Sequence, residues 1–230
     1  MRNTCLITGT SRGIGRELAA AFAGEYYVIG LSRSPASITL PDYEHHVVDL
    51  SDEDALKEKL QKILDQHPDI SVLVNNAATL HSLPLAVMDE AHIDAMVKVN
   101  LLSPIYCTRS VIRRMIHNKR GRILNVSSMA PQRLVPGDSV YAATKAALET
   151  FARIVNAEVA SANIRVNCLA ISAYESGMLE KIVAGDVKKV TQHIPHGKLT
   201  TIDEIIAAAR YLLSFDHHDI GGQTIRLGGV

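Results

Sequence analysis

Short apolar runs alternate with longer amphipathic stretches along this chain, and this alternation is what most limits the folds open to it. The apolar runs, which predict strands, are CLIT, YVIGL, HHVVD, VLVNN, RILNVS, IRVNCLA and QTIRL. Helices are predicted between them, over residues 13–23, 51–66, 90–118 with a bend, 139–162 and 201–214. Strands that alternate with helices are typical of parallel sheets. The pattern predicts an α/β fold, a doubly wound parallel sheet of about seven strands with helices on both faces.

The chain is predicted to form one domain over residues 1–230. Its length suffices to bury a single core, and no repeat or linker interrupts the pattern. Residues 31–45 contain Pro35 and Pro41 in a stretch too short for a confident full helix. Residues 173–198 contain three glycines and a proline between weak helical patterns, which predicts a flap over a pocket.

Charge and cysteine content restrict the partners and the compartment. Lysine plus arginine and aspartate plus glutamate number 24 each, without a block of like charge, so nucleic acid and membranes are not expected partners. Cys5, Cys107 and Cys168 lie far apart, which is typical of reduced thiols. We see no signal segment and no apolar run of membrane-spanning length, so a cytoplasmic localisation is expected. No metal site is predicted, because the histidines lack a carboxylate or cysteine at ligand spacing.

A glycine-rich loop, TGTSRGIG at residues 8–15, follows the first predicted strand and opens the first helix. Glycine permits a tight turn there, and the free N–H groups at the helix start favour a phosphate. The glycines could serve turn geometry alone, but the flanking strand and helix favour a dinucleotide site. The loop residues predicted to bind the dinucleotide are Gly9, Ser11, Arg12, Gly13, Ile14 and Gly15.

The end of the second strand predicts which dinucleotide binds. An acidic side chain there would hold the ribose hydroxyls and select NAD. This chain has Ser32 and Arg33 instead, and an arginine pairs with a 2′-phosphate, on which Arg12 of the glycine loop can also converge. Either arginine alone is as well explained by a solvated surface position, but the two together indicate NADP(H).

The stretch YAATK places Tyr141 and Lys145 four residues apart, which is one helical turn. The phenol and the ammonium then lie on one face of a helix. Taken alone, the pair is better explained as part of an amphipathic surface.

Together, the glycine loop, NNAA at residues 75–78 and YAATK resemble the short-chain dehydrogenase/reductase family, whose fold is of the Rossmann type. The resemblance covers essentially the whole chain and is closest to 3-oxoacyl-acyl carrier protein reductases, on IPHGKLTTIDEI and GGQTIRL. It implies a catalytic tetrad of Asn100, Ser128, Tyr141 and Lys145. It also implies cofactor contacts from Asp49, Leu50, Asn76, Ala77, Tyr174 and Ser176, in addition to Tyr141 and Lys145.

The resemblance implies reduction of a ketone or a 3-oxoacyl thioester to a secondary alcohol, with hydride from NADPH and a proton from Tyr141. A free tyrosine has a pKa of about 10, and Lys145 is expected to lower the pKa of Tyr141 by favouring the phenolate. Ser128 is expected to donate to the carbonyl oxygen, and Asn100 to anchor a water that returns protons to Lys145. The alternatives are a dehydrogenase of another secondary alcohol, or a non-catalytic NADP-binding regulator or scaffold of the same fold.

Fewer residues bear on the substrate and the partners. Residues 129–140 and 174–196 are expected to wall the pocket, where Met129, Leu134, Val135 and Met178 favour an acyl or alicyclic ketone and Arg133 is expected to be solvated. Candidate contacts for an acidic acyl carrier protein are Lys119, Arg120 and Arg122. Residues 170–173 depart from the family, which usually has a Pro-Gly pair there beside the nicotinamide. The resemblance also implies a homo-oligomer, a tetramer in most of the family.

Overall fold

The computed structural model describes residues 3–174, 191, 194, 197–216 and 219–228. At its centre lies a seven-stranded parallel sheet with the order β3-β2-β1-β4-β5-β6-β7. The strands are β1 Thr4–Thr8, β2 Tyr27–Ser32, β3 Tyr43–Val47, β4 Ile70–Asn75, β5 Gly121–Ser128, β6 Ile164–Ile171 and β7 Thr224–Leu227. The order runs outward in both directions from β1 and β4, as in a doubly wound sheet. The predicted fold class is therefore confirmed.

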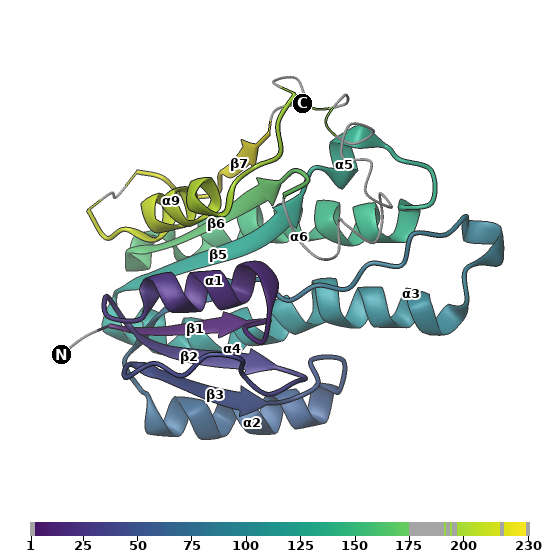
Figure 1. The fold of residues 1–230 in the computed structure, drawn as a ribbon. Helices are drawn as coiled ribbons and strands as arrows, with labels where there is room; N and C mark the ends of the chain where they lie inside the picture. The colour runs from purple at the N-terminus through teal and green to yellow at the C-terminus, as the bar shows by residue number, and fades with distance from the viewer. Residues whose placement is uncertain (1–2, 175–190, 192–193, 195–196, 217–218, 229–230) are drawn as a thin grey trace.

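Helices cover both faces of the sheet (Figure 1). The α-helices are α1 Gly13–Phe22, α2 Glu53–Gln66, α3 Glu90–Val97, α4 Ser103–Asn118, α5 Ala130–Arg133, α6 Ser139–Val159 and α9 Ile202–Leu213. α1 and α9 pack on one face, in a core that includes Cys5 and Ile7 of β1. α2, α4 and α6 pack on the other face, in a core that includes Leu6. Alternate residues of β1 therefore serve opposite cores, which is why the strand is buried along its whole length.

The predicted bend in residues 90–118 is a π-helix, η2 Lys98–Leu102, between α3 and α4. A π-turn redirects the side chains of a helix and is frequent at functional sites. Here it carries Asn100, whose side chain is fully buried. No helix forms between β2 and β3, in keeping with the two prolines.

The helix predicted over residues 139–162 ends in the 3-10 turn η3 Ala160–Ala162, which follows α6. Short elements that the sequence pattern did not predict are η1 Leu85–Val87 and α5. They are too short to show a hydrophobic period of their own. Most of the predicted flap over residues 173–198 lies outside the described residues, as does Ser176.

Several helix starts follow from local sequence. Asp52 begins α2 by accepting a hydrogen bond from the Ala55 amide at 3.0 Å. Thr201 and Glu204 form a capping box at the start of α9, the arrangement expected of a T-x-x-E sequence. In the part of the chain that the structure describes, no helix combines the length and the apolar character that a bilayer crossing requires.

Candidate active site

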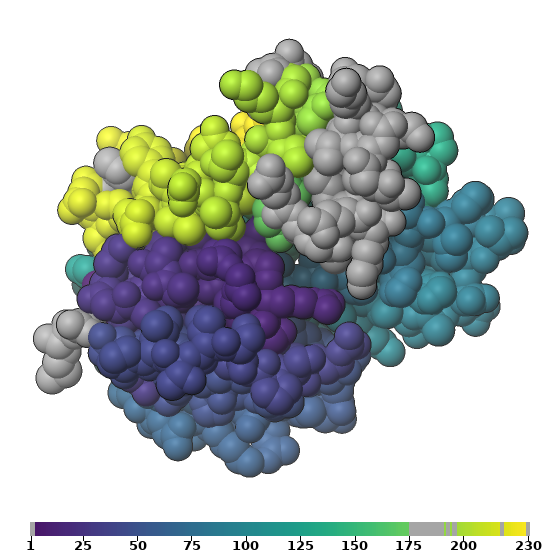
Figure 2. Space-filling view, viewed as in Figure 1, coloured from purple at the N-terminus to yellow at the C-terminus, as the bar shows by residue number. Residues whose placement is uncertain are grey.

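The carboxyl edge of the sheet brings together loops that are far apart in the sequence. β1 leads into the glycine loop, β4 leads into Asn76, and β5 ends at Ser128. Ligands of doubly wound sheets bind at this edge, where the strand order reverses. Figure 2 shows a recess on this side of the molecule between the purple N-terminal segment and the teal segment around α3.

The glycine loop packs against the turn after β4. A Cβ on Gly9, which has a φ of +79°, would lie 2.7 Å from Asn76 Nδ2 and 2.9 Å from Ala77 Cα. A Cβ on Gly15 would overlap the carbonyl oxygen of Gly9. Asn76 Nδ2 donates to the Thr8 carbonyl at 2.9 Å, and the amides of Asn76 and Ala77 both donate to Thr8 Oγ1 at 3.0 Å. The structure thus places these four predicted cofactor residues side by side.

The start of α1 suits a phosphate. Arg12 is the N-cap residue but makes no capping hydrogen bond with its side chain, and the first turn contains no acidic residue. The first N–H groups of the helix therefore remain open to an anion. A Cβ on Gly13 would lie 3.1 Å from the Tyr174 hydroxyl, so the chain after β6 reaches this loop. These observations fit the phosphate groups of a dinucleotide.

The adenosine end of the proposed cofactor site lies at the ends of β2 and β3. Ser32 is buried and donates to the Ser34 carbonyl at 2.9 Å, while Arg33 and Arg12 are exposed. Hydrogen bonds from Ser51, aided by the charge of Arg33, lower the pKa of Asp49. Leu50 is buried beside it. The arrangement leaves two guanidinium groups accessible to a phosphate and no carboxylate at the end of β2.

Ser128, Tyr141 and Lys145 meet at the end of β5. The Ser128 side chain lies close enough to the Tyr141 phenol to act on its pKa, and Ser128 Oγ accepts from the Ala130 amide at 3.1 Å. Lys145 lies one turn farther along α6, with its ammonium 5.7 Å from the centroid of the Tyr141 ring. That ammonium is buried and donates to the Val126 carbonyl at 2.8 Å. A hydroxyl, a phenol and a cation therefore converge at this point.

Asn100 is linked to this group through the start of α6. Its side chain accepts from the Thr79 amide at 2.8 Å and donates to the Thr79 carbonyl at 2.9 Å. Its Nδ2 also lies 3.3 Å from Thr144 Oγ1, and Thr144 precedes Lys145. Asn100 therefore ties the loop after β4 to the helix that carries Tyr141 and Lys145.

Burial dominates the protonation of both α6 residues. It lowers the pKa of Lys145 to about 8, because the charged ammonium loses its hydration. Burial also raises the pKa of Tyr141, against the lowering effect of the Ser128 hydrogen bond and together with the charge of Asp138. The expectation that Lys145 lowers the pKa of Tyr141 is therefore wrong for this structure, since desolvation outweighs any attraction across the ring.

Comparison with known proteins identifies the family. The profile described as short chain dehydrogenase matches residues 3–186. The chain belongs to the short-chain dehydrogenase family.

Relatives of this short-chain dehydrogenase match it over nearly their whole length. The 3-oxoacyl-[acyl-carrier-protein] reductase of Chlamydia trachomatis is 31% identical over 100% of this chain and 97% of its own. The structure of a gluconate 5-dehydrogenase from Burkholderia cenocepacia, in complex with NADP and tartrate, is 27% identical and superposes with a TM-score of 0.91 over 99% of this chain and 94% of its own. A 3-oxoacyl (acyl-carrier-protein) reductase from Agrobacterium tumefaciens with NADP bound is 25% identical, with a TM-score of 0.89 over 99% and 94%.

The turn after β6, where the family's usual Pro-Gly pair is absent, runs on beside β7. The Ser172 amide donates to the Leu227 carbonyl at 3.1 Å, and the Thr200 amide donates to the Ala173 carbonyl at 3.1 Å. Arg133 of α5 donates to Ser172 Oγ at 2.9 Å and is half-buried. The expectation that Arg133 is solvated is therefore wrong, because α5 folds it back onto this turn.

The candidate carrier contacts lie at the other edge of the sheet. Lys119 and Arg120 precede β5, whose eight residues separate them from Ser128. At about 3.3 Å per residue this distance exceeds 20 Å. Arg122 is buried and donates to the carbonyls of Ser214 and Gly121 at 2.8 and 2.9 Å. Within one chain these residues therefore do not border the cleft, and a carrier contact through them stays a prediction.

A buried acid near Lys145 was missed in the sequence. Glu149 lies one turn beyond Lys145 and is 8% exposed. Its Oε1 accepts from Ser127 at 2.7 Å, its Oε2 lies 3.4 Å from Arg226 Nη2, and its charge acts to raise the pKa of Lys145. Opposite charges four residues apart were the available signal. Among the described residues, no cluster of three metal-ligating side chains occurs.

Proposed function

We propose that this short-chain dehydrogenase reduces a ketone or a 3-oxoacyl thioester to the secondary alcohol with NADPH, and that Tyr141 is the general acid. The observation that carries the proposal is that Ser128, Tyr141 and Lys145 meet at the end of β5, on the same edge of the sheet as the glycine loop. A proton donor for an alkoxide must lie within hydrogen-bond reach of the carbonyl oxygen. A carbonyl that accepts from Ser128 would also meet the Tyr141 hydroxyl.

NADPH supplies the hydride when it is bound. The residues proposed to hold its phosphates are the glycine loop, Arg12 and Arg33, which the NADP-bound structures of relatives support. Asp49, Leu50, Asn76 and Ala77 would line the adenosine and pyrophosphate, and Lys145 would hold the nicotinamide ribose. Tyr174 and Ser176 are proposed farther along the cofactor.

The protonation states suit reduction. Because burial raises the pKa of Tyr141, the phenol holds its proton at neutral pH and can donate it to the developing alkoxide. Lys145, with a pKa of about 8, holds a positive charge at neutral pH and is close enough to neutrality to exchange protons. We propose that Asn100 anchors the water through which the proton on Lys145 is replaced.

The substitution Tyr141→Phe tests the mechanism. It removes the donated proton but keeps the ring, so turnover should fall by about 10²–10⁴-fold. NADPH affinity should stay within a few-fold, which calorimetric titration would measure. Tyr106→Phe, on α4 away from the site, is the matched control. Turnover by Tyr141→Phe near that of the wild type would refute the mechanism.

A substrate that carries a carboxylate is a second candidate, favoured by Arg133. Its half-buried guanidinium meets no carboxylate in the ion pairs of the described residues, and it lies beside Ser172, the residue after the β6 position paired with Ser128. The tartrate and gluconate named for one relative have carboxylates as well. The expectation that apolar side chains in the pocket wall favour an acyl or alicyclic ketone has less support. Leu134 and Val135 are 78% and 47% exposed, although Met129 is buried.

A turnover assay with several substrates distinguishes the substrate classes. Ketones, 3-oxoacyl thioesters, oxo acids and the methyl esters of those acids would be compared for NADPH oxidation, and secondary alcohols for NADP reduction. A preference for each acid over its ester would support Arg133 as its partner. Turnover of none of them with NADPH bound would favour the non-catalytic alternative.

A further inference from the structure

His45 occupies the junction between the glycine loop and the end of β2. Its Nδ1 lies 2.7 Å from the Tyr43 hydroxyl and 3.2 Å from Thr10 Oγ1. Its Nε2 lies 3.0 Å from the Ser34 carbonyl and 3.2 Å from Ser32 Oγ. One imidazole thus joins the two segments from which Arg12 and Arg33 project.

The hydrogen bonds define the tautomer of the neutral ring. A carbonyl oxygen can only accept, so the Nε2 that meets Ser34 carries the proton. Nδ1 is then the acceptor, and the Tyr43 hydroxyl donates to it across 2.7 Å. Thr10 Oγ1 lies 3.1 Å from the Tyr43 oxygen and completes the chain from β3 to the glycine loop.

The backbone of β2 leaves space for this chain of hydroxyls. Gly30 stands directly opposite His45 in the parallel ladder. A Cβ there would overlap both Thr10 Oγ1 and the Tyr43 hydroxyl. A glycine inside a strand weakens it unless another group must approach closely, and here the approaching group is the Tyr43–Thr10 pair.

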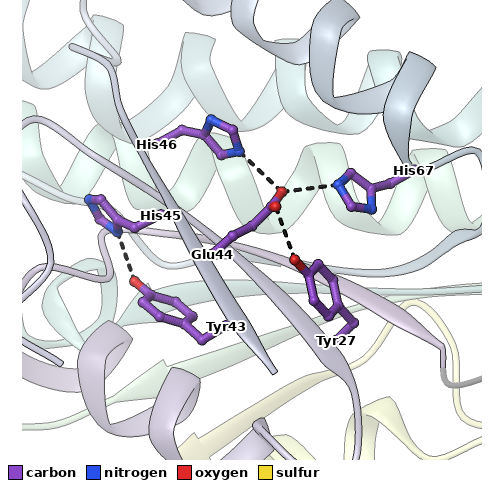
Figure 3. A network of polar contacts seen from close by, with 6 residues as sticks. All are labelled: Tyr27, Tyr43, Glu44, His45, His46 and His67. Carbon is purple, nitrogen blue, oxygen red and sulfur yellow. Dashed lines mark hydrogen bonds and ion pairs between the residues drawn. The ribbon is translucent and has the colours of Figure 1, made fainter. Parts of the chain in front are cut away.

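The neighbouring histidine on β3 belongs to a separate cluster. Glu44 Oε1 lies 3.1 Å from His46 Nε2 and 3.0 Å from His67 Nε2, and the Tyr27 hydroxyl donates to Glu44 Oε2 at 3.0 Å. Figure 3 shows this group on one side of β3 and the Tyr43–His45 pair on the other. The carboxylate is thus occupied away from His45, whose own polar partners are the hydroxyls of Tyr43, Thr10 and Ser32 and the Ser34 carbonyl.

We propose that His45 is a positioning residue for the 2′-phosphate of NADPH, holding the glycine loop and the end of β2 at the separation that lets Arg12 and Arg33 bind one phosphate. This inference rests on the proposed phosphate contacts of those two arginines. NADH lacks the phosphate and should be affected far less. When a second proton binds Nδ1, that nitrogen becomes a donor to the Tyr43 oxygen, and the Tyr43 hydroxyl turns to Thr10. The added positive charge then favours the phosphate.

The pH window follows from the surroundings. Burial lowers the pKa of His45, with the charge of His46 in the same direction and the Ser34 hydrogen bond opposing it. The ring is therefore neutral at pH 7 and gains its proton below about pH 6.5. The phosphate itself loses charge below a pKa of about 6, so its titration must be separated from that of His45.

Two variants test the proposal by calorimetric titration of NADPH and NADH. His45→Leu removes every hydrogen bond of the ring and should weaken NADPH binding about tenfold while changing NADH binding less than about twofold. His45→Gln keeps one donor and one acceptor but cannot titrate. Near pH 7.5 it should match the wild type, and its Kd for NADPH relative to the wild type should rise several-fold by about pH 5.5. His46→Gln, on the same strand but facing the other way, is the matched control.

The outcomes separate this inference from its foundations. A constant Kd ratio between His45→Gln and wild type across this pH range would overturn it, even if His45→Leu failed to fold. Equal loss of NADPH and NADH binding in His45→Leu would also overturn it. Arg33→Met tests the underlying phosphate site. If this variant still preferred NADPH over NADH as the wild type does, the proposed phosphate site would be refuted. If it lost that preference while the His45 variants bound NADPH like the wild type, only the role of His45 would be refuted. Tyr141→Phe tests the catalytic mechanism independently of the His45 and Arg33 variants.

Discussion

At the scale of single residues, Lys145 shows how the proposed function opposes stability. Its ammonium is buried and donates a hydrogen bond to the Val126 carbonyl. Burial lowers its pKa from 10.5 to about 8, so the folded protein holds this charge at a cost on the order of 3 kcal/mol. A packing role alone would be better served by an apolar side chain.

We therefore expect Lys145→Met to stabilise the cofactor-free protein while abolishing turnover. The lost hydrogen bond to Val126 offsets part of the gain, so the thermal midpoint at pH 7 should rise by about 2–6 °C. Because the folded pKa lies below the unfolded one, the cost in the wild type is fully present below about pH 8 and disappears as the pH rises to about 10.5. The advantage of the variant should shrink over that range, measured by calorimetry with exposed Lys98→Met as control. A variant less stable than wild type at every pH would contradict this account.

At the scale of elements, a few side chains decide how helices and strands join. The π-helix η2 turns Asn100 inward, where it binds the loop after β4 and the start of α6. Arg122, near the start of β5, likewise joins separate segments, at the edge of the sheet opposite the active site. It donates to the carbonyls of Ser214, at the end of α9, and Asn163, after η3, and its guanidinium lies 4.6 Å from the ring centroid of Phe215.

Arg122→Met should lower the free energy of unfolding by about 2–4 kcal/mol. The methionine fills most of the space but leaves buried carbonyl oxygens without their donors. Urea unfolding followed by circular dichroism would measure the loss. Arg120→Met is the control, since Arg120 is exposed and stacks on the same Phe215 ring, 3.8 Å from its centroid. Equal effects of the two substitutions would show that the ring contact, and not the carbonyl network, matters.

At the scale of the whole molecule, the homotetramer implied by the family resemblance stays a prediction. α4 and α6 lie on the same face of the sheet, and each exposes a large apolar side chain, Ile116 at 46% and Ile154 at 56%. Apolar side chains on the outer face of a helix are typical of subunit contacts.

We expect light scattering at micromolar concentration to give four times the mass of the chain. Ile154→Arg should reduce that mass while preserving the circular dichroism spectrum, because a charge in the contact would have to be desolvated. Leu85→Arg, at an equally exposed apolar position on η1, should leave the mass unchanged. A wild-type protein that is monomeric at this concentration would end the prediction.

The sequence by itself determined the features that depend on near neighbours in the chain. Apolar runs and helical periods predicted the parallel sheet. The two prolines after β2 predicted that no helix forms there, and the four-residue spacing predicted that Tyr141 and Lys145 share one face of a helix. Only the tertiary structure decided which distant segments meet. It buried Arg122, turned Arg133 onto Ser172, moved Lys119 away from the cleft and enclosed His45 between the glycine loop and β2. The environment of a charged or polar group depends on the elements packed around it, and strand order and register, which no local pattern encodes, bring those elements together.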